Sequence, residues 1–404
     1  MLLGPVYWLF PSGLTLLVVQ DLLFAASAVP IMRLASARLG DRLSAAVGVS
    51  YLMSWGLWSA VESQFHEIAF AVPLSSYSLC SWIESEGRSR SAIVSMAALV
   101  FVKEDLGLTV AAFGLVVIWI EWGRTTREGD FDLYVRSLTS LMATLRSRTA
   151  RIGAGLAAWG ILWTLLAITV ILPAIHPGGT WEYTDRLSQT DTMTTGPFTR
   201  LIFPTVKLQT LGLLALAAGV IGAVSPYMWI MVPTLAWRFL GNVDFYWGWH
   251  WHYSAILVPM AVVALVDSAH RRRRIRGAAA LAVAVSLCSN LAVAWTSTID
   301  QFFDRQPHAL TARQRTAAEG AVAIAGSGHR VVASLRLLAY LVPDNRVFWE
   351  GTAKGADVDV VAVDPASAAS SSGEAADKWA EERFGGRWRI VYLKEGYQVA
   401  VRIE

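Results

Sequence analysis

Long apolar runs separated by short polar connections fill the first three quarters of the chain. About 20 apolar residues in a helix cross the hydrocarbon core of a bilayer. We therefore expect a mainly α, polytopic integral membrane domain over residues 1–298. About ten transmembrane helices are expected, approximately at 14–32, 44–61, 67–83, 92–103, 106–121, 152–172, 204–224, 226–240, 253–269 and 277–298.

Basic residues alternate between the connections. One set of connections carries about 16 of them and the intervening set roughly three, namely Arg186, Arg200 and Lys207. Because lysine and arginine favour cytoplasmic loops, we expect the arginine-rich set in the cytoplasm. That set comprises Arg33, Arg38, Arg42, Arg88, Arg90, Arg124, Arg127, Arg136, Arg146, Arg148, Arg151, Arg271, Arg272, Arg273, Arg274 and Arg276.

The apolar stretch 92–121 is interrupted by Lys103, Glu104 and Asp105. A single helix would leave these charges in hydrocarbon, at about 2.5–3.5 kcal/mol each. It would also place the 271–276 arginine cluster outside. We therefore predict two short helices that turn at 103–105 on the outer side, with the charged turn in a water-filled cavity.

Two further segments differ from the apolar runs. Residues 130–150 combine helical apolar spacing with arginines, which predicts either an interfacial amphipathic helix or a helix packed on cytoplasmic loops. Residues 299–404 lose the long apolar runs and predict a small extracytoplasmic α/β domain. It has an expected helix at 311–325, strands at 329–334, 358–364, 388–394 and 397–403, and a loop at 366–376.

Composition supports the membrane assignment and excludes several classes. Hydrophobic residues make up 54% and charged residues 16%, and the mean hydropathy is +0.45. The net charge of +3 gives no indication of nucleic acid. Cys80 and Cys288 both lie in apolar segments, which excludes a disulfide framework and gives no metal-site spacing. The start lacks a signal-peptide pattern and opens on an apolar run.

Polar residues meet at the expected outer ends of the helices. Ionisable groups at a membrane edge are costly and indicate function. Three connections supply them, and the candidates are Glu67, Glu104 and Asp105 as catalytic residues, with His66, Lys103, Asp244, His250, His252 and Tyr253 as substrate-binding residues. The carboxylates can act as a general base or orient one, and the cationic groups can bind a phosphate oxyanion.

Plainer explanations remain open for each of these motifs. His66 and Glu67 also fit the start of a helix, where a carboxylate is stabilised by the helix dipole. Glu104 and Asp105 also fit neutralisation by Lys103. The aromatic residues of 246–253 fit an interfacial belt as well as a sugar platform. His250 and His252 give only weak support for a divalent cation, no other cofactor motif is present, and the cofactor stays unknown.

Several motifs together resemble a known family. They are the run 11–20, Phe65-His66-Glu67 with Pro73, Lys103-Glu104-Asp105-Leu106-Gly107-Leu108, His252-Tyr253 with Pro259, and Lys394-Glu395-Gly396-Tyr397. This set resembles the bacterial membrane proteins of the domain of unknown function 2079 family, which in turn looks related to C-type (GT-C) glycosyltransferases. The resemblance covers nearly the whole chain. Related proteins have an additional first helix and an acidic external loop that this chain lacks at its start.

The resemblance implies a glycosyltransferase in the bacterial cytoplasmic membrane. Its partners would be the lipid bilayer, a polyprenyl-phosphate-linked sugar donor and an envelope glycan or protein acceptor, with no nucleic acid. If the family's base lies in the absent loop, the chain alone is expected to be inactive. Two alternatives stay open, a membrane transporter or lipid flippase and a non-catalytic envelope scaffold.

Overall fold

The computed structural model describes residues 3–128, 138–175, 181, 197–241, 243–272, 274–275, 277–296, 310–353, 355–367 and 375–403. The chain divides into two compact units. Val19–Asp300 form a helical unit, and Met1–Val18 join Gln301–Glu404 in a second unit that holds the sheet. The first 18 residues thus belong to the second unit, whereas the sequence pattern assigned them to the membrane domain.

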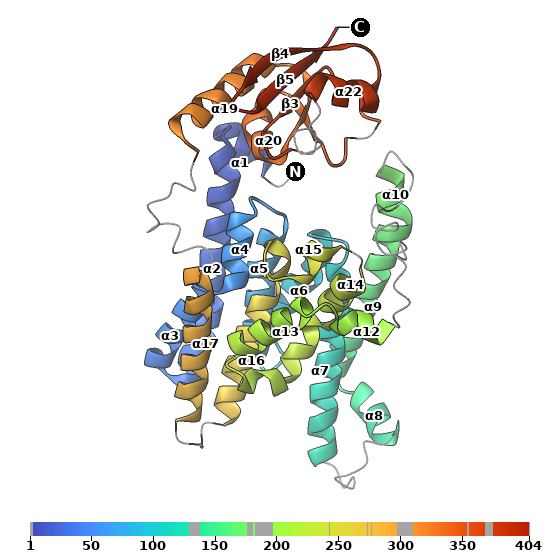
Figure 1. Ribbon diagram of the computed structural model, residues 1–404. Helices are drawn as coiled ribbons and strands as arrows, with labels where there is room; N and C mark the ends of the chain where they lie inside the picture. Colours follow the sequence, from blue (N-terminus) through green and yellow to red (C-terminus); the bar gives the residue numbers. More distant parts are fainter. Residues whose placement is uncertain are drawn as a thin grey trace. The chain divides into compact units, whose positions relative to one another are not determined.

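The helical unit is a bundle of long and short helices (Figure 1). Its elements, with α2 entering from residue 13, are α2 (Gly13–Leu39), α3 (Asp41–Leu52), α4 (Trp55–Glu62), α5 (Ile68–Glu84), α6 (Arg90–Ala98), η1 (Leu99–Phe101), α7 (Leu106–Glu128), α8 (Leu138–Leu145), α9 (Arg148–Leu166), η2 (Ala167–Ile171), α10 (Leu172–Ile175), α12 (Pro197–Ile202), α13 (Val206–Ala217), η3 (Ile221–Val224), η4 (Pro226–Met231), α14 (Val232–Leu240), α15 (Asp244–Trp247), η5 (His252–Ser254), α16 (Leu257–Arg271) and α17 (Ala278–Ala294).

Helix α16 lies at the centre of this unit. Twelve of its 15 residues are buried, and they are apolar on all sides except Ser268. A helix that is hydrophobic all round has to be surrounded by other elements. It packs against α5, α13, η3 and η4, among others. The core of the helical unit is therefore built around α16.

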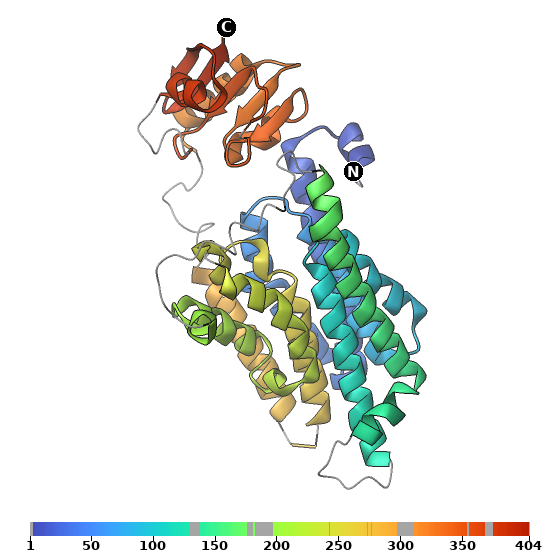
Figure 2. The ribbon, with the colours of Figure 1, turned by 90° about the vertical axis from the view of Figure 1, so that its right-hand side faces the viewer.

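Helices α7 and α9 pack closely along their length, and Figure 2 shows them side by side in teal and green. Two glycine pairs allow the approach. Gly107 faces Gly160 and Gly114 faces Gly153, and a Cβ built on any of them meets the partner helix's backbone carbonyl. Small residues at helix crossings let backbones come together in this way. The glycines lie seven residues apart on each helix, which places both pairs on one face.

Among the described residues, three helices are long and apolar enough to cross a membrane, Gly13–Leu39, Leu106–Thr126 and Arg148–Ile175. A fourth span results if the pair Asp244–Ser254 and Leu257–Arg271, which is bent by 70°, counts as one. The described residues therefore contain fewer long spanning helices than the ten or so expected from the sequence. Shorter apolar helices occupy several of the other predicted positions, at Arg90–Phe101, Val206–Ala217 and Ala278–Ala294.

Backbone breaks explain the difference. The predicted span 44–61 is divided at Met53 and Ser54 between α3 and α4. The predicted span 204–224 is interrupted where Gly219 and Val220 both adopt positive φ, at 59° and 62°. A continuous helix cannot pass through such residues. The predicted break at 103–105 is present, since η1 ends at Phe101 and α7 begins at Leu106.

The second unit is a five-stranded sheet with helices on both faces. Strand order is β2-β1-β3-β5-β4, with β1 (Arg330–Ala333) parallel to β2 (Arg346–Trp349) and β3 (Val360–Val363), and β5 (Tyr397–Arg402) antiparallel to β3 and β4 (Trp388–Lys394). The helices of the unit are α1 (Gly4–Leu9), α19 (Ala312–Ala325), α20 (Leu335–Leu341) and α22 (Ala376–Phe384).

Alternation along the strands creates two cores in this unit. Val331 and Ala333 of β1 point to the core shared with α19 and α20, and Val332 between them points to the core shared with α22. Successive strand residues face opposite sides of a sheet. All four residues of β3 are buried, as expected for a strand covered on both faces.

The predicted secondary structure of this unit is partly confirmed. The helix at 311–325 and the four strands are present within one or two residues. Glu395 and Gly396 both have positive φ, at 49° and 81°, which is the conformation of a tight hairpin turn. The sequence pattern missed β2, α20 and α22. In the predicted loop 366–376, residues 368–374 lie outside the described residues. In the predicted amphipathic segment 130–150, residues 130–137 lie outside them as well.

Candidate functional site

The turn Lys103-Glu104-Asp105 joins η1 to the first residue of α7. The backbone N–H of Leu106 donates to the carbonyl of Lys103, and that of Leu108 donates to the carbonyl of Asp105. Thr164 Oγ1 on α9 donates to the carbonyl of Glu104 at 3.0 Å. The close approach of α7 and α9 thus fixes the position of the turn, and the helix N-terminus favours negative charge there.

A cavity of about 280 Å³ opens beside this turn. Its lining combines the three charged residues of the turn with aromatic and apolar groups from α7, α9, η2, α14 and α15, together with Trp181 and Gly241. The lining residues are Lys103, Glu104, Asp105, Leu108, Thr164, Ile168, Trp181, Trp237, Gly241 and Tyr246. Such a mixture of a few polar groups on apolar walls is typical of ligand sites.

The two oxygens of Asp105 differ in their surroundings. Trp237 Nε1 on α14 donates a hydrogen bond to Oδ2 at 2.9 Å. Oδ1 is buried and has no hydrogen-bond partner among the described residues. Buried polar groups are normally satisfied, and an orphaned acceptor costs free energy. The indole therefore fixes the orientation of the carboxylate and leaves one acceptor for a ligand.

Glu104 is the second carboxyl of the cavity. Burial raises its pKa above the usual value, and the neighbouring charge of Asp105 raises it further. Two carboxyls close together in a poorly solvated site do not ionise equally readily. The pKa of Glu104 is thus shifted toward neutral pH, the direction that a general acid or base requires.

Lys103 connects this cavity with the loop before α5. Its Nζ lies 3.7 Å from Glu67 Oε1 and 6.0 Å from the centre of the Tyr253 ring. Its side chain is largely buried, while that of Glu67 is about half exposed. Three segments distant in the sequence, around residues 67, 103 and 253, therefore meet at one cation. The predicted convergence of these residues is present.

His66 and His252 stack face to face, with ring centres 3.5 Å apart and an interplanar angle of 18°. The His66 backbone N–H donates to Gln20 Oε1 at 3.2 Å, and Gln20 Nε2 donates to the carbonyl of Ala60. Burial lowers the pKa of His66, and nearby Lys103 also lowers it. A neutral imidazole is then favoured at neutral pH, so Lys103, and not His66, is the cation available to a phosphate.

Asp244 and His250 lie elsewhere. Both are exposed and line a separate cavity of about 320 Å³, together with Trp247 and Trp251. Tyr246, between them in sequence, points the other way and is buried in the wall of the first cavity. The sequence pattern placed Asp244 and His250 with the other candidates, but the structure separates them.

Two buried cations hold this region and were not among the predicted residues. Arg238 is fully buried and donates to the carbonyls of Tyr246 (2.8 Å) and Gly248 (2.9 Å), and more weakly toward Tyr253 and Ser254. Lys207 donates to the carbonyls of Phe239 and Arg200 and lies 4.2 Å from the Trp247 ring centre. An arginine inside the apolar run 226–240 was the available signal, since such residues are rarely incidental.

No group of three His, Cys, Asp or Glu side chains suited to a metal ion occurs within the described parts of the chain. The stacked histidines have one carboxylate neighbour, Glu67, which faces Lys103.

Comparisons with known proteins give one match. No curated protein and no solved structure matches the chain. The family described as "Predicted membrane protein (DUF2079)" matches residues 1–399, which is nearly the whole chain. The apolar helices described above agree with that description. The chain belongs to the DUF2079 family of predicted membrane proteins.

Proposed function

We propose that this protein is an integral-membrane glycosyltransferase of the inverting C type. It moves a sugar from a polyprenyl-phosphate donor to a glycan or protein of the bacterial cell envelope. The observation that carries the proposal is the cavity beside Asp105, where a buried carboxylate oxygen that has no partner among the described residues lies next to Glu104. Transfer takes place at this cavity, and its residues supply the acid–base and binding groups.

The carboxyls fit the needs of sugar transfer. The acceptor hydroxyl loses a proton as it attacks the anomeric carbon, and a carboxylate within hydrogen-bond reach can take that proton. Glu104 is the base in this scheme because it lines the cavity beside Asp105 and because burial raises its pKa, which favours uptake of a proton. Asp105, oriented by Trp237, binds and orients a hydroxyl group of the substrate through Oδ1.

The remaining walls fit the other parts of such a substrate. Aromatic rings pack against the apolar faces of sugars, and Trp181, Trp237 and Tyr246 supply them. Leu108 and Ile168 offer an apolar surface to the first isoprene units. Lys103 lies at the charged end and stabilises the departing phosphate. Glu67, paired with Lys103, holds that cation in place.

The arginine distribution supports the proposed location. It favours a cytoplasmic position for the connections that carry Arg38, Arg124 and Arg271. These residues lie at or near the C-terminal ends of α2, α7 and α16, whereas the cavity lies at the start of α7. The site then opens toward the outer face of the membrane. In the same scheme the α/β unit is extracytoplasmic.

One observation favours the second candidate, a transporter or lipid flippase. The 70° bend between Asp244–Ser254 and Leu257–Arg271 resembles the broken helices that form transport sites. Uptake or flipping by proteoliposomes without sugar transfer would support this alternative. The cavity at Asp105 would then bind a transported solute.

The test is sugar transfer by the full chain reconstituted in nanodiscs with radiolabelled polyprenyl-phosphate sugars and an envelope extract as acceptor. Glu104→Gln and Glu67→Gln are compared with Glu84→Gln, which alters an exposed carboxylate that does not line the cavity. We expect Glu104→Gln to lower turnover by roughly 100-fold, the lower range for loss of a general base, with Glu67→Gln intermediate and Glu84→Gln unchanged. Equal turnover in all three variants would contradict the assignment of the site.

A further inference from the structure

A second cavity, of about 260 Å³, lies one helix length away from the first. Helix α7 begins beside Asp105 and first lines this cavity at Val117, 12 residues later, or about 18 Å along the helix. Helix α16 likewise runs from the His252 end of the bundle to Asp267 and Arg271, which line the cavity. This cavity is therefore separate from the proposed transfer site, and the inference below does not depend on that function.

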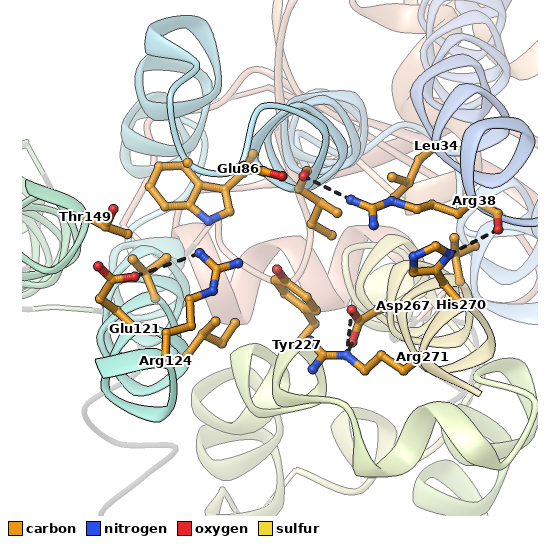
Figure 3. A pocket seen from close by; sticks show the side chains of 16 residues that line it. Leu34, Arg38, Glu86, Glu121, Arg124, Thr149, Tyr227, Asp267, His270 and Arg271 are labelled. Atoms are coloured by element: carbon orange, nitrogen blue, oxygen red, sulfur yellow. Dashed lines mark hydrogen bonds and ion pairs between the residues drawn. The ribbon is translucent and has the colours of Figure 1, made fainter. Parts of the chain in front are cut away.

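Three arginines and a tyrosine surround this cavity. They are Arg38 at the end of α2, Arg124 near the end of α7, Arg271 at the end of α16 and Tyr227 on η4. Figure 3 shows the Arg124 and Arg38 guanidinium groups directed inward from two sides, with the Tyr227 ring between them. His270 adds a ring whose Nδ1 lies 3.1 Å from the carbonyl of Arg38. Four separate elements thus direct donors to one space.

Within the described residues, most of these donors have no acceptor. A guanidinium carries five N–H groups. Arg38 makes one long hydrogen bond there, from Nη2 to the carbonyl of Ile83 at 3.4 Å. Arg271 uses Nε, which donates to both oxygens of Asp267 at 3.0 Å. Arg124 makes a 3.9 Å ion pair with Glu121. The other N–H groups of the three arginines can therefore bind a ligand.

The carboxylates of the cavity are engaged with protein groups. Asp267 faces Arg271 and accepts a hydrogen bond from Ser225 Oγ at 2.9 Å. Glu121 faces Arg124, and Glu86 faces Arg88 at 3.6 Å. Asp267 thereby fixes the Arg271 side chain through Nε alone, which directs its two terminal nitrogens away from the pair. The negative groups orient Arg124 and Arg271, and Arg38 has no carboxylate partner within the described parts of the chain.

Stabilisation of helix ends is the plainer explanation for these arginines, since cations near a C-terminus interact favourably with the helix dipole. Arg38 and Arg271 lie in the last turns of α2 and α16. That explanation does not require a cavity between them. Nor does it account for the buried Tyr227, whose hydroxyl makes no hydrogen bond with the described residues.

We propose that this cavity binds a phosphate group, carried either by an anionic lipid headgroup or by a soluble phosphate compound. Planar guanidinium forks match the tetrahedral oxygens of phosphate and bind two at a time. Arg38 and Arg124 hold the phosphate from two sides, Arg271 contacts it from the end of α16, and the Tyr227 hydroxyl donates the remaining hydrogen bond. The charge asymmetry places this end at the cytoplasmic leaflet, where anionic lipids are concentrated.

Two binding measurements on the full chain distinguish the sources. In neutral detergent, inorganic phosphate is titrated against the thermal unfolding temperature at constant ionic strength. In nanodiscs, native mass spectrometry counts phosphatidylglycerol retained from a phosphatidylcholine background. A lipid site retains phosphatidylglycerol whatever the response to inorganic phosphate, and a soluble-ligand site responds to inorganic phosphate alone. No response in either measurement contradicts the proposal.

Matched variants test the residues. The double change Arg38→Gln with Arg124→Gln should weaken binding roughly tenfold or more, because it removes charge-assisted hydrogen bonds. Arg33→Gln is the control, since Arg33 is an exposed arginine on the same helix that does not line the cavity. Equal binding by both variants overturns the assignment. Should the double variant fail to fold, Tyr227→Phe, which removes only the hydroxyl, should weaken binding several-fold, and unchanged binding there also overturns it.

Discussion

The indole N–H of Trp237 donates to Oδ2 of Asp105 across 2.9 Å and joins α14 to the start of α7. The second oxygen of that carboxylate is buried and has no partner in the part of the chain that the structure describes. Trp237 therefore acts as a positioning residue for Asp105. Its distance from Asp105 in the sequence, 132 residues, means that only the folded bundle brings the pair together.

Replacing Trp237 with Phe should lower sugar transfer while leaving the fold intact. Phe keeps an aromatic ring at this position, but the smaller side chain lacks the indole N–H, so the hydrogen bond to the carboxylate, worth about 1.5–3 kcal/mol, is lost. We expect turnover to fall roughly tenfold or more. The measurement is steady-state transfer by Trp237→Phe beside Trp229→Phe, an indole that is 55% exposed. An equal loss in both variants would show that the indole N–H is not the cause.

Arg238 should be essential for the stability of the segment 244–254. Arg238→Met keeps much of the volume but leaves the carbonyls of Tyr246 and Gly248 buried without their donors. Each orphaned acceptor costs about 1–3 kcal/mol, so we expect a clear fall in the unfolding temperature in detergent. Arg88→Met changes an exposed arginine and should have almost no effect, within about 0.5 kcal/mol. Similar unfolding temperatures for both variants would contradict this role.

The glycine contacts between α7 and α9 give a third prediction. Gly160→Ala places a methyl group against the backbone of Gly107, and overpacking of this kind costs about 1–3 kcal/mol. Gly155→Ala on the same helix has no atom within 4 Å of the new methyl and should be neutral or slightly stabilising. Thermal unfolding of the two variants is compared. A tolerated Gly160→Ala would mean that α7 and α9 are not held this closely.

The α/β unit should lose stability in acid through Asp359. Hydrogen bonds from Arg330 lower the pKa of this carboxyl. A carboxyl with a lowered pKa in the fold stabilises that fold above its unfolded pKa, about 3.9. This stabilisation is lost as the pH falls from there through the folded pKa.

Hydrogen exchange measured on peptides of this unit in the full chain tests the prediction. Protection around β1 and β3 should decrease as the pH falls toward and below about 4, after correction for intrinsic exchange. Asp359→Asn should remove that pH dependence. Asp344→Asn, at an exposed carboxylate, should preserve it. Retained pH dependence in Asp359→Asn would assign the effect to another group.

The break before α7 was predictable because three consecutive charges cannot remain in hydrocarbon. The Glu395-Gly396 turn was predictable from local conformational preference. The bend before α16 and the break at Gly219 could not be predicted. The length of an apolar run carries no information about where the backbone turns. Strand β2 was missed because it is short and half exposed.

The candidate site likewise contains contacts that could be predicted from the sequence and contacts that could not. Lys103, Glu67 and Tyr253 meet as expected because each follows or precedes an apolar run at the same end. Asp244 and His250 do not join them, since their direction is set by the hydrogen bonds of Arg238 to the segment's backbone. The Trp237–Asp105 contact could not be predicted, because it depends on how α14 packs against α7.

Whether sugar transfer takes place at the Asp105 cavity is tested most directly by comparing Asp105→Asn with Asp244→Asn. Sugar transfer by both variants is measured in nanodiscs with a polyprenyl-phosphate donor. Both changes remove one carboxylate from the same region, but only Asp105 lines the cavity beside Glu104. We expect Asp105→Asn to lose roughly 100-fold or more in turnover, because an oriented charged acceptor is removed from the site. Asp244→Asn should keep native turnover. Native turnover in Asp105→Asn, or equal losses in both variants, would contradict this expectation.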